Sequence, residues 1–410
     1  MAYSPEGVKS GCTANGYVVK SVIIPANKIY SSKPNNNPMN LTKIHLHHLR
    51  MPLVSPFETS FGRAVDRDCI LVEVETDAGL IGWGEVVADR DPGYAYETVE
   101  TAWHILRDYI VPQFIGKPFL LPDAYVQQTQ KIKGHGMAKA GLEMALWDLW
   151  GQRDNRSLQD LLGAKRERVP VGVSVGLQDS PDELVEVVAG YVRDGYQRIK
   201  LKIKPGRDVG EVKAVRDAFP DIQLQVDANS AYTLDTADAL RPLDAYDLLL
   251  IEQPLSEDDL WDHAKLQAQL TTPICLDESI IHPRSAQHAL EMKSCRVINI
   301  KQGRVGGLVN AKAIHDMCAA RGVPVWCGGM LETGVGRAAN LALASLPNFT
   351  LPGDISATER YYHQDVTHEV FTLNDDSTVT VPTQPGLGVH INRDALAGYR
   401  VRDAVFAHEK

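Results

Sequence analysis

From about residue 169 onward the chain repeats one unit, a short apolar run followed by a polar turn and an amphipathic helix. Strands that alternate with helices pair in parallel, and eight consecutive units favour a closed barrel. An open doubly wound sheet is the alternative, but no glycine-rich phosphate-binding turn follows an early strand. We therefore predict an α/β fold with a TIM-type barrel over residues 166–365. The expected strands are Pro170–Val175, Arg198–Ile203, Ile222–Val226, Leu248–Ile251, Ile274–Leu276, Val297–Ile300, Val325–Cys327 and Phe349–Leu351.

The residues before the barrel follow a different pattern. Alternating apolar and polar residues at 43–50, 69–76 and 80–85 predict strands, and the stretches 95–109 and 137–150 predict helices. Strands followed by helices indicate an α+β domain over residues 41–165. Residues 1–40 show neither period, so we predict a disordered N-terminal tail. Residues 366–410 are expected to return to the α+β domain.

Composition and charge exclude several classes of protein. The net charge is −10 and lysine and arginine do not cluster, which argues against nucleic-acid binding. The longest apolar stretches are strand-sized, whereas a membrane span needs about 20 residues. The six cysteines are scattered without a CxxC pair, and no signal-peptide pattern occurs. These features predict a cytoplasmic protein.

Charged residues end five of the apolar runs at nearly constant spacing. Lys202, Asp227, Glu252, Asp277 and Lys301 follow one another at intervals of 25, 25, 25 and 24 residues. Because these intervals match the repeating unit, each residue occupies the same place at the carboxyl end of its own strand. Active sites of TIM-type barrels lie at that end. The sequence therefore predicts that five charged groups converge on one cavity.

The three acids of this series predict a metal site. A single acid at a strand end most often caps the following helix. Three acids in register, Asp227, Glu252 and Asp277, would repel one another strongly unless a cation lay between them. Ligand sets made only of oxygen atoms favour hard cations, so we predict Mg²⁺, with Mn²⁺ as a possible substitute.

The lysines indicate proton transfer. Strand alternation in Arg198–Ile203 places Lys200 and Lys202 opposite the apolar residues, on the face that in a parallel barrel points inward. Lys301 approaches the same cavity from the opposite wall. The metal and the neighbouring ammonium groups are expected to lower the lysine pKa values toward the range of a base. Two bases on opposite faces of a carbon next to a carboxylate permit racemisation, whereas one base and a leaving group permit β-elimination.

Five motifs connect these residues to a known family: Lys200-x-Lys202, Asp227-Ala-Asn229, Glu252-Gln-Pro, Asp277-Glu278-Ser and Asn-Ile-Lys301. They resemble the muconate-lactonising branch of the enolase superfamily, and within it the o-succinylbenzoate synthase/N-acylamino acid racemase group. Further similar stretches lie at residues 56–62, 201–206, 225–229, 303–307, 325–334 and 351–354. The resemblance extends from residue 41 to about residue 393.

The resemblance implies a (β/α)7β TIM-type barrel with an N-terminal α+β capping domain over its mouth. It implies that Lys202 and Lys301 form the acid/base pair, and that Asp227, Glu252 and Asp277 bind Mg²⁺. The residues that it places around the substrate are Lys200, Asn229, Glu278, Phe57, Thr59, Phe61, Arg304, Gly329 and Met330. A mobile loop at residues 55–62, hinged at Gly62, is expected to exclude water. In the family, arginine at position 304 accompanies racemase activity, and relatives form dimers or octamers.

The expected substrate is a small carboxylate with an apolar, aromatic or N-acyl appendage. The expected reaction is syn-dehydration to o-succinylbenzoate, racemisation of N-acyl or N-succinyl amino acids, or both, because the two share one half-reaction. Muconate cycloisomerisation remains an alternative; dipeptide epimerisation is less favoured, because Asp354-Ile-Ser356 replaces the Asp-x-Asp of those enzymes. Two other classes are a zinc hydrolase, suggested by His45-Leu-His47, and a barrel that serves only as a binding scaffold. The complete set of acids and lysines at the rim argues against both.

Overall fold

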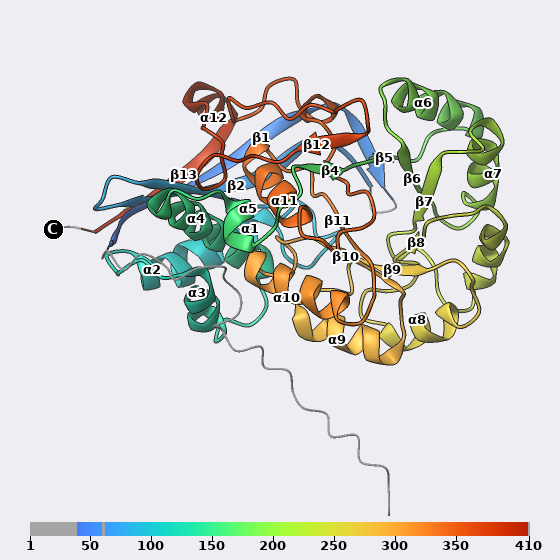
Figure 1. Cartoon of the computed structure of the whole chain (residues 1–410), viewed down its shortest axis with the longest axis horizontal. Helices are drawn as coiled ribbons and strands as arrows, with labels where there is room; N and C mark the ends of the chain where they lie inside the picture. Colours follow the sequence, from blue (N-terminus) through green and yellow to red (C-terminus); the bar gives the residue numbers. More distant parts are fainter. Residues whose placement is uncertain (1–38, 60–61, 409–410) are drawn as a thin grey trace, which may run out of the picture.

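The structure, a computed structural model, describes residues 39–59 and 62–408. An N-terminal domain, blue and cyan in Figure 1, lies beside a ring of strands and helices coloured green to orange. The last residues, in red, run back to the N-terminal domain. No helix within the described residues is both long and apolar enough to cross a membrane. Residues 1–38 of the predicted tail lie outside the described residues. Met39, which the prediction placed in the tail, is buried in the fold.

The N-terminal domain is built on an antiparallel sheet with the strand order β13-β1-β2-β3. These strands are β1 (Leu41–Thr59), β2 (Gly62–Thr76), β3 (Ile81–Val86) and β13 (Arg400–Ala407). The helices are α1 (Val99–Ile105), α2 (Val111–Phe114), α3 (Pro122–Thr129), α4 (Gly136–Asp154) and α5 (Leu158–Leu162). Helix α4 lies so close to β3 that a Cβ atom on Gly84 would clash with the carbonyl oxygen of Gly141. Ile44, Leu46 and Val72 share one face of the sheet and form a core with these helices.

The first helix is shorter than the sequence predicts. Thr98 ends the preceding loop and forms a capping box with Thr101, so α1 begins at Val99 rather than near residue 95. Residues 106–110 then form a π-helical turn before α2. Asn155, with a positive φ of 50°, ends α4 beyond the predicted residue 150.

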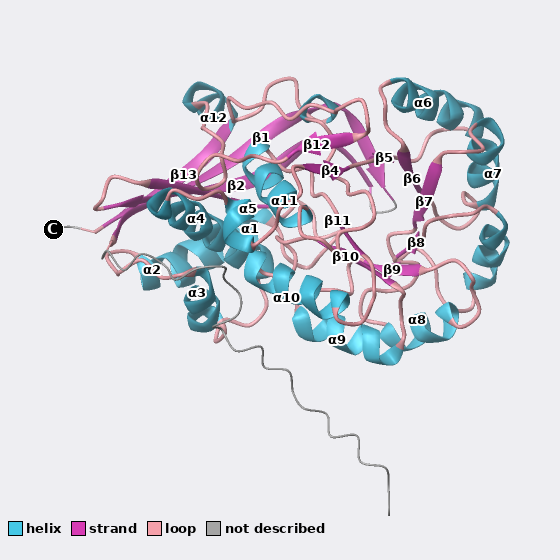
Figure 2. Ribbon diagram, viewed as in Figure 1, coloured by secondary structure: helices cyan, strands magenta, loops and turns pink. Residues whose placement is uncertain are grey.

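Seven parallel strands form the curled sheet of the barrel in the order β5 to β11. The strands are β5 (Val173–Val175), β6 (Arg198–Lys202), β7 (Gln223–Asp227), β8 (Ile251–Glu252), β9 (Ile274–Leu276), β10 (Val297–Ile300) and β11 (Val325–Cys327). The helices between and after them are α6 (Pro181–Arg193), α7 (Val209–Ala218), α8 (Leu260–Gln267), α9 (Pro283–Met292), α10 (Leu308–Ala319) and α11 (Gly334–Ala344), which surround the strands in Figure 2. A 3₁₀ segment with Pro242 inside it, Ala237–Ala245, replaces a helix between β7 and β8. The predicted α/β barrel with an N-terminal α+β domain is confirmed.

The eighth predicted strand is not a regular element of the described structure. Phe349 makes a single parallel bridge to Val325, and Gly353 makes one to Val171. Pro352 between them has no backbone N–H, which interrupts a continuous ladder. The segment still reaches from β11 to the residues before β5, and it closes the barrel.

The first predicted strand is divided into two. β4 (Arg168–Pro170) pairs with β12 (Thr378–Thr380), a strand of the C-terminal segment, and only β5 joins the barrel sheet. The C-terminal segment then continues through α12 (Arg393–Tyr399) to β13, which pairs with β1.

Two buried acids of the N-terminal domain bind the N-termini of barrel helices. Glu143 on α4 accepts the first two backbone N–H groups of α10, at 2.6 and 2.9 Å. Glu85 on β3 accepts the backbone N–H groups of Thr333 (3.1 Å) and Gly336 (2.9 Å) at the start of α11. Helix N-termini carry unpaired donors and a partial positive charge, so both acids join the two domains.

These acids make the stability of the fold depend on pH. Burial raises the pKa of Glu85 and of Glu143 to about 7. An acid with a raised pKa in the folded state stabilises it while protonated, so its contribution is lost as pH rises from about 4.5 through 7. Between these pH values, the free energy of unfolding of Glu143→Gln is expected to fall by up to about 3 kcal/mol less than that of the wild type.

Urea unfolding at about pH 5 and about pH 8 measures this change, with the exposed Glu186→Gln as control. An unfolding free energy that falls with pH as steeply in Glu143→Gln as in the wild type would contradict the prediction.

Candidate active site

The carboxyl ends of the barrel strands bring the predicted charged residues together. In the sheet register Lys202 on β6 lies opposite Asp227 on β7, which lies opposite Glu252 on β8. Asp277 and Lys301 directly follow β9 and β10. All five side chains are buried. The 25-residue spacing therefore corresponds to one strand-helix unit of the barrel.

Lys200 lies at the centre of a buried charge network. Its ammonium is 3.0 Å from Glu252, 3.2 Å from Asp227 and 2.6 Å from Asp354. Asp354, on the segment that closes the barrel, also pairs with Arg198 at 2.7 Å. Burial raises the pKa of Asp354, but the two cations outweigh this effect and hold it at about 2.

Lys202 is held by polar groups of the neighbouring strand. Its Nζ donates to Asp227 Oδ2 at 2.6 Å and to Asn229 Oδ1 at 2.7 Å. The amide of Asn229 donates to Glu278 Oε1 at 3.0 Å. The second carboxylate oxygen of Glu278 is buried and accepts no hydrogen bond from another described residue. Burial, together with the charge of Asp227, raises the pKa of Glu278.

Lys301 is placed by residues of both domains. Its Nζ donates to Asp277 Oδ2 at 2.8 Å and to the hydroxyl of Tyr94 at 3.1 Å. Arg304 pairs with Asp277 and donates to the same hydroxyl at 2.9 Å. Tyr94 lies on the loop between β3 and α1, so the N-terminal domain reaches the barrel rim directly.

The pKa values of Lys200 and Lys301 are set by the protein groups around them. Burial lowers the pKa of Lys200, but Asp354 and other carboxylates outweigh it and raise the pKa. The pKa of Lys301 is also raised, because Tyr94 and Glu252 outweigh burial. Without the charge of a metal ion, carboxylates lie closer to each ammonium than other cations do, so the lowering expected next to a bound metal stays a prediction. A divalent cation bound by those carboxylates would offset their charge.

The predicted metal ligands fit a hard cation in composition. Asp227, Glu252 and Asp277 come from adjacent strands, but within the described residues their oxygens turn toward lysines and do not gather within 4.8 Å of one another. Burial and the charge of Asp227 raise the pKa of Glu252, which shows that the acids disfavour one another's charge. An all-carboxylate donor set with the unpaired oxygen of Glu278 beside it suits a divalent cation.

A pocket of about 280 Å³ lies between the barrel rim and the N-terminal domain. Eight of the predicted residues line it: Phe57, Thr59, Lys200, Lys202, Asn229, Lys301, Gly329 and Met330. The other five predicted residues lie behind this lining and contact it through hydrogen bonds or ion pairs: Asp227, Glu252, Asp277, Glu278 and Arg304. The predicted residues therefore form one site in two layers.

The segment predicted as a loop over the pocket is the end of a hairpin. Phe57 pairs with Ala64 and Thr59 pairs with Gly62, beyond a register irregularity between Pro52 and Phe57. The strand pattern of β1 and β2 therefore continues further than the sequence suggests. Gly62 has a φ of 148°, a conformation that favours glycine. Phe61 lies outside the described residues.

Sequence reasoning missed several residues of this site. Tyr94 and Arg67 belong to the N-terminal domain, and Arg67 is a buried guanidinium that donates to the carbonyl of Met330 at 3.0 Å. Their positions depend on contacts between distant segments, for which the sequence gives no signal. The inward position of Arg198 could have been predicted, because the strand alternation that turns Lys200 inward also turns Arg198 inward.

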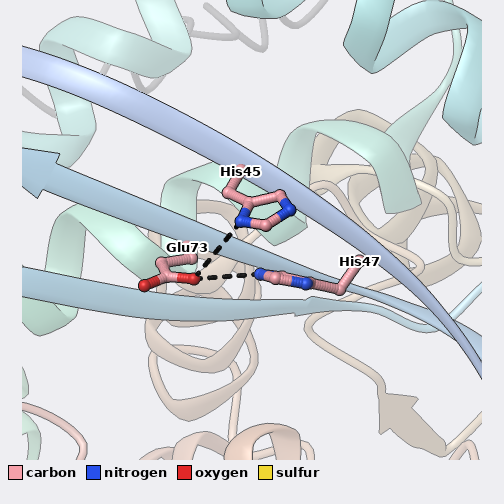
Figure 3. Close-up of side chains that lie close together, drawn as sticks. All are labelled: His45, His47 and Glu73. Carbon is pink, nitrogen blue, oxygen red and sulfur yellow. Dashed lines mark hydrogen bonds and ion pairs between the residues drawn. The ribbon is translucent and has the colours of Figure 1, made fainter. Parts of the chain in front are cut away.

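The histidines that suggested zinc form a cluster on the antiparallel sheet of the N-terminal domain rather than at the barrel rim. Figure 3 shows His45 and His47 of β1 beside Glu73 of β2. Glu73 Oε2 lies 2.9 Å from His47 Nε2, and both oxygens of Glu73 accept from Arg393, at 2.6 and 2.8 Å. Burial raises the pKa of Glu73, but His47 and Arg393 outweigh it and lower it to about 2. A guanidinium already neutralises this carboxylate, so we interpret the cluster as an ion-pair network that ties the C-terminal segment to the sheet.

Comparison with known families decides the class of the chain. Residues 42–163 match the mandelate racemase/muconate lactonizing enzyme N-terminal domain, and residues 183–395 match the enolase C-terminal domain-like family. This chain belongs to the mandelate racemase/muconate lactonizing branch of the enolase superfamily. The resemblance predicted from the motifs is confirmed, and the chain is an enolase-superfamily enzyme.

Similar members of the enolase superfamily carry two activity names. The o-succinylbenzoate synthase of Geobacillus kaustophilus is 50% identical over 362 residues, covering 88% of this chain and 96% of the relative. The N-succinylamino acid racemase of an Amycolatopsis species is 51% identical over 352 residues, covering 86% and 95%. The crystal structure of an enolase-superfamily member from Listeria innocua superposes with a TM-score of 0.87 at 41% identity, covering 90% and 99%.

Proposed function

We propose that this enzyme is a Mg²⁺-dependent o-succinylbenzoate synthase and N-succinylamino acid racemase. One observation carries the proposal: Lys202 and Lys301 line one pocket from strands β6 and β10, which are four places apart in the curled sheet. Two amines that approach a substrate carbon from opposite walls suit transfer of a proton through that carbon. Relatives of nearly equal identity carry either name, so we assign both reactions to one site.

In racemisation, one lysine acts as base and the other as acid. The amine on one face takes the α-proton, and the electron pair of the broken C–H bond is delocalised into the carboxylate as an enediolate. The ammonium on the other face then gives its proton to the α-carbon, and the configuration inverts. Lys200, two residues before Lys202 on β6, also lines the pocket and is placed to hold the substrate carboxylate by charge.

In dehydration, one lysine suffices. The amine takes the α-proton of 2-succinyl-6-hydroxy-2,4-cyclohexadiene-1-carboxylate, and the freed electron pair forms the new C=C bond. The hydroxyl on the neighbouring carbon leaves with its bonding pair, and receives a proton to become water. Because a syn elimination keeps both groups on one face, the same lysine can return the proton it took.

The proposed metal ligands are Asp227, Glu252 and Asp277. A divalent cation bound there would supply positive charge for the carboxylate oxygens, onto which the negative charge spreads when the α-proton is lost. The buried carboxylates and the unpaired oxygen of Glu278 support this assignment. Oxygen ligands favour Mg²⁺, with Mn²⁺ as a substitute.

Assays of both reactions on one preparation test the proposal. Formation of the aromatic product is followed by ultraviolet absorbance, and racemisation of N-succinyl-phenylalanine by optical rotation. If one site serves both, N-succinyl-phenylalanine inhibits the synthase competitively with a Ki equal to its own KM. Formation of neither product in the presence of Mg²⁺ would reject the proposal.

Both substrates carry a second carboxylate on their succinyl group, and Arg63 is placed to bind it. Arg63 lines the pocket from the end of the hairpin and makes no ion pair with another described residue. Arg63→Gln is expected to raise KM for N-succinyl-phenylalanine about tenfold, with kcat within about threefold. N-acetyl-phenylalanine lacks the second carboxylate and should keep its KM. Equal changes in KM for the two substrates would contradict this role.

The remaining expectations concern the state of the enzyme in the cell. The described cysteines, Cys69, Cys275, Cys295, Cys318 and Cys327, are free and buried, which supports a reducing, cytoplasmic compartment. We also propose a homo-oligomer, either a dimer or an octamer. Light scattering during gel filtration measures the mass, and a 45.1 kDa monomer would reject it.

A further inference from the structure

Tyr94 connects the N-terminal domain to the reacting end of Lys301. Its hydroxyl accepts from Lys301 Nζ at 3.1 Å and from Arg304 Nη1 at 2.9 Å, and donates to Asp277 Oδ1 at 3.1 Å. The ammonium also lies 4.4 Å from the centre of the tyrosine ring. A phenol hydroxyl has one donor and two acceptor positions, so it can make these three hydrogen bonds at the same time.

The loop that carries Tyr94 is fixed at its base. The backbone N–H of Val99 donates to the carbonyl of Asp89 at 2.7 Å, which closes the loop before α1. The buried Arg67 donates to the carbonyl of Ala88 at 3.3 Å and to that of Met330 in the barrel. The ends of the loop that carries Tyr94 are therefore held by contacts that do not involve the reacting groups.

A phenol has a property that the other partners of Lys301 lack. Asp277 only accepts hydrogen bonds, so it cannot donate to the lone pair that Lys301 exposes as a neutral amine. The hydroxyl of Tyr94 can accept from the ammonium or donate to the neutral amine. A lysine that takes and gives a proton passes through both states, so Tyr94 can hold its nitrogen in place throughout.

We propose that Tyr94 is a positioning residue for Lys301, which makes proton transfer on the Lys301 face depend on the N-terminal domain. The role rests on the proposed function of Lys202 and Lys301 as bases on opposite faces. Lys202 is held by Asp227 and Asn229 of the barrel instead. Loss of the Tyr94 hydroxyl should therefore affect one face of the substrate and spare the other.

The experiment follows loss of the α-proton from N-succinyl-L-phenylalanine and from its D enantiomer in D₂O by ¹H NMR. The Lys202→Ala variant identifies the enantiomer whose proton Lys301 removes, because only Lys301 remains as a base. In Tyr94→Phe, initial exchange of that enantiomer is expected to fall about tenfold to hundredfold. Exchange of the other enantiomer should stay within about threefold of the wild type.

Tyr94→Phe keeps the aromatic ring, and the matched control is Tyr96→Phe, an exposed tyrosine on the same loop. The ratio of the two exchange rates within one preparation is independent of the fraction of folded enzyme. Equal loss for both enantiomers, or no loss for either, would overturn the role of Tyr94. Wild-type enzyme that exchanges neither enantiomer would reject the proposed function itself, and the inference with it.

Discussion

The Lys202→Ala and Lys301→Ala enzymes are each expected to lose racemisation by about 10³-fold or more. Inversion at the α-carbon needs a base on one face and an acid on the other, and a positioned acid/base group contributes about 10²- to 10⁴-fold. Each single variant should still exchange the α-proton of one enantiomer, and the two variants should retain opposite enantiomers. The double variant should exchange neither.

Dehydration should respond differently from racemisation, because one lysine is enough for a syn elimination. One of the single variants is expected to lose the synthase reaction, while the other retains it in reduced amount. The exposed Lys204→Ala, two residues beyond Lys202, is the matched control for loss of a charge at this strand end. Racemisation at the wild-type rate in both single variants would contradict the two-base mechanism and would favour a different active site.

Removal of the divalent cation should stop both reactions, with a loss of about 10³-fold or more. Deprotonation next to a carboxylate creates a second negative charge on the substrate, and several kcal/mol of its stabilisation come from the cation. Mg²⁺ should restore activity to enzyme treated with EDTA, and Mn²⁺ should replace it. Glu252→Gln removes one ligand charge with little change of shape, and should weaken Mn²⁺ binding measured by calorimetry at least tenfold.

The exposed Glu257→Gln, on the loop after β8, is the control for this substitution and should bind Mn²⁺ as the wild type does. Elemental analysis of the treated enzyme gives the residual metal. Full turnover in enzyme whose metal content is far below one ion per chain would contradict a metal-dependent reaction.

The barrel and its rim were predictable from the sequence because both repeat with the same period. The spacing of Lys202, Asp227 and Glu252 equals the length of one strand-helix unit, and the observed register places these three residues side by side. The eighth strand was predicted from its apolar residues alone. A pattern of apolar residues takes no account of Pro352, which lacks a backbone N–H and interrupts the pairing of this strand.

The contribution of the N-terminal domain was predicted less completely. Phe57 and Thr59 line the pocket, but they do so from a hairpin rather than from a loop. Tyr94 and Arg67 act through contacts across more than 200 residues of sequence, which no local period encodes. The direction of the Lys301 pKa shift depends on its distances to individual carboxylates, which only the folded structure supplies.

The most direct test of the account is the ¹H NMR spectrum of N-succinyl-L-phenylalanine in D₂O with the enzyme and Mg²⁺. We predict that the α-proton signal disappears while the optical rotation falls toward zero, because lysines on both faces reach the α-carbon. An α-proton signal and a rotation that both persist, in enzyme that also forms no o-succinylbenzoate, would contradict the account.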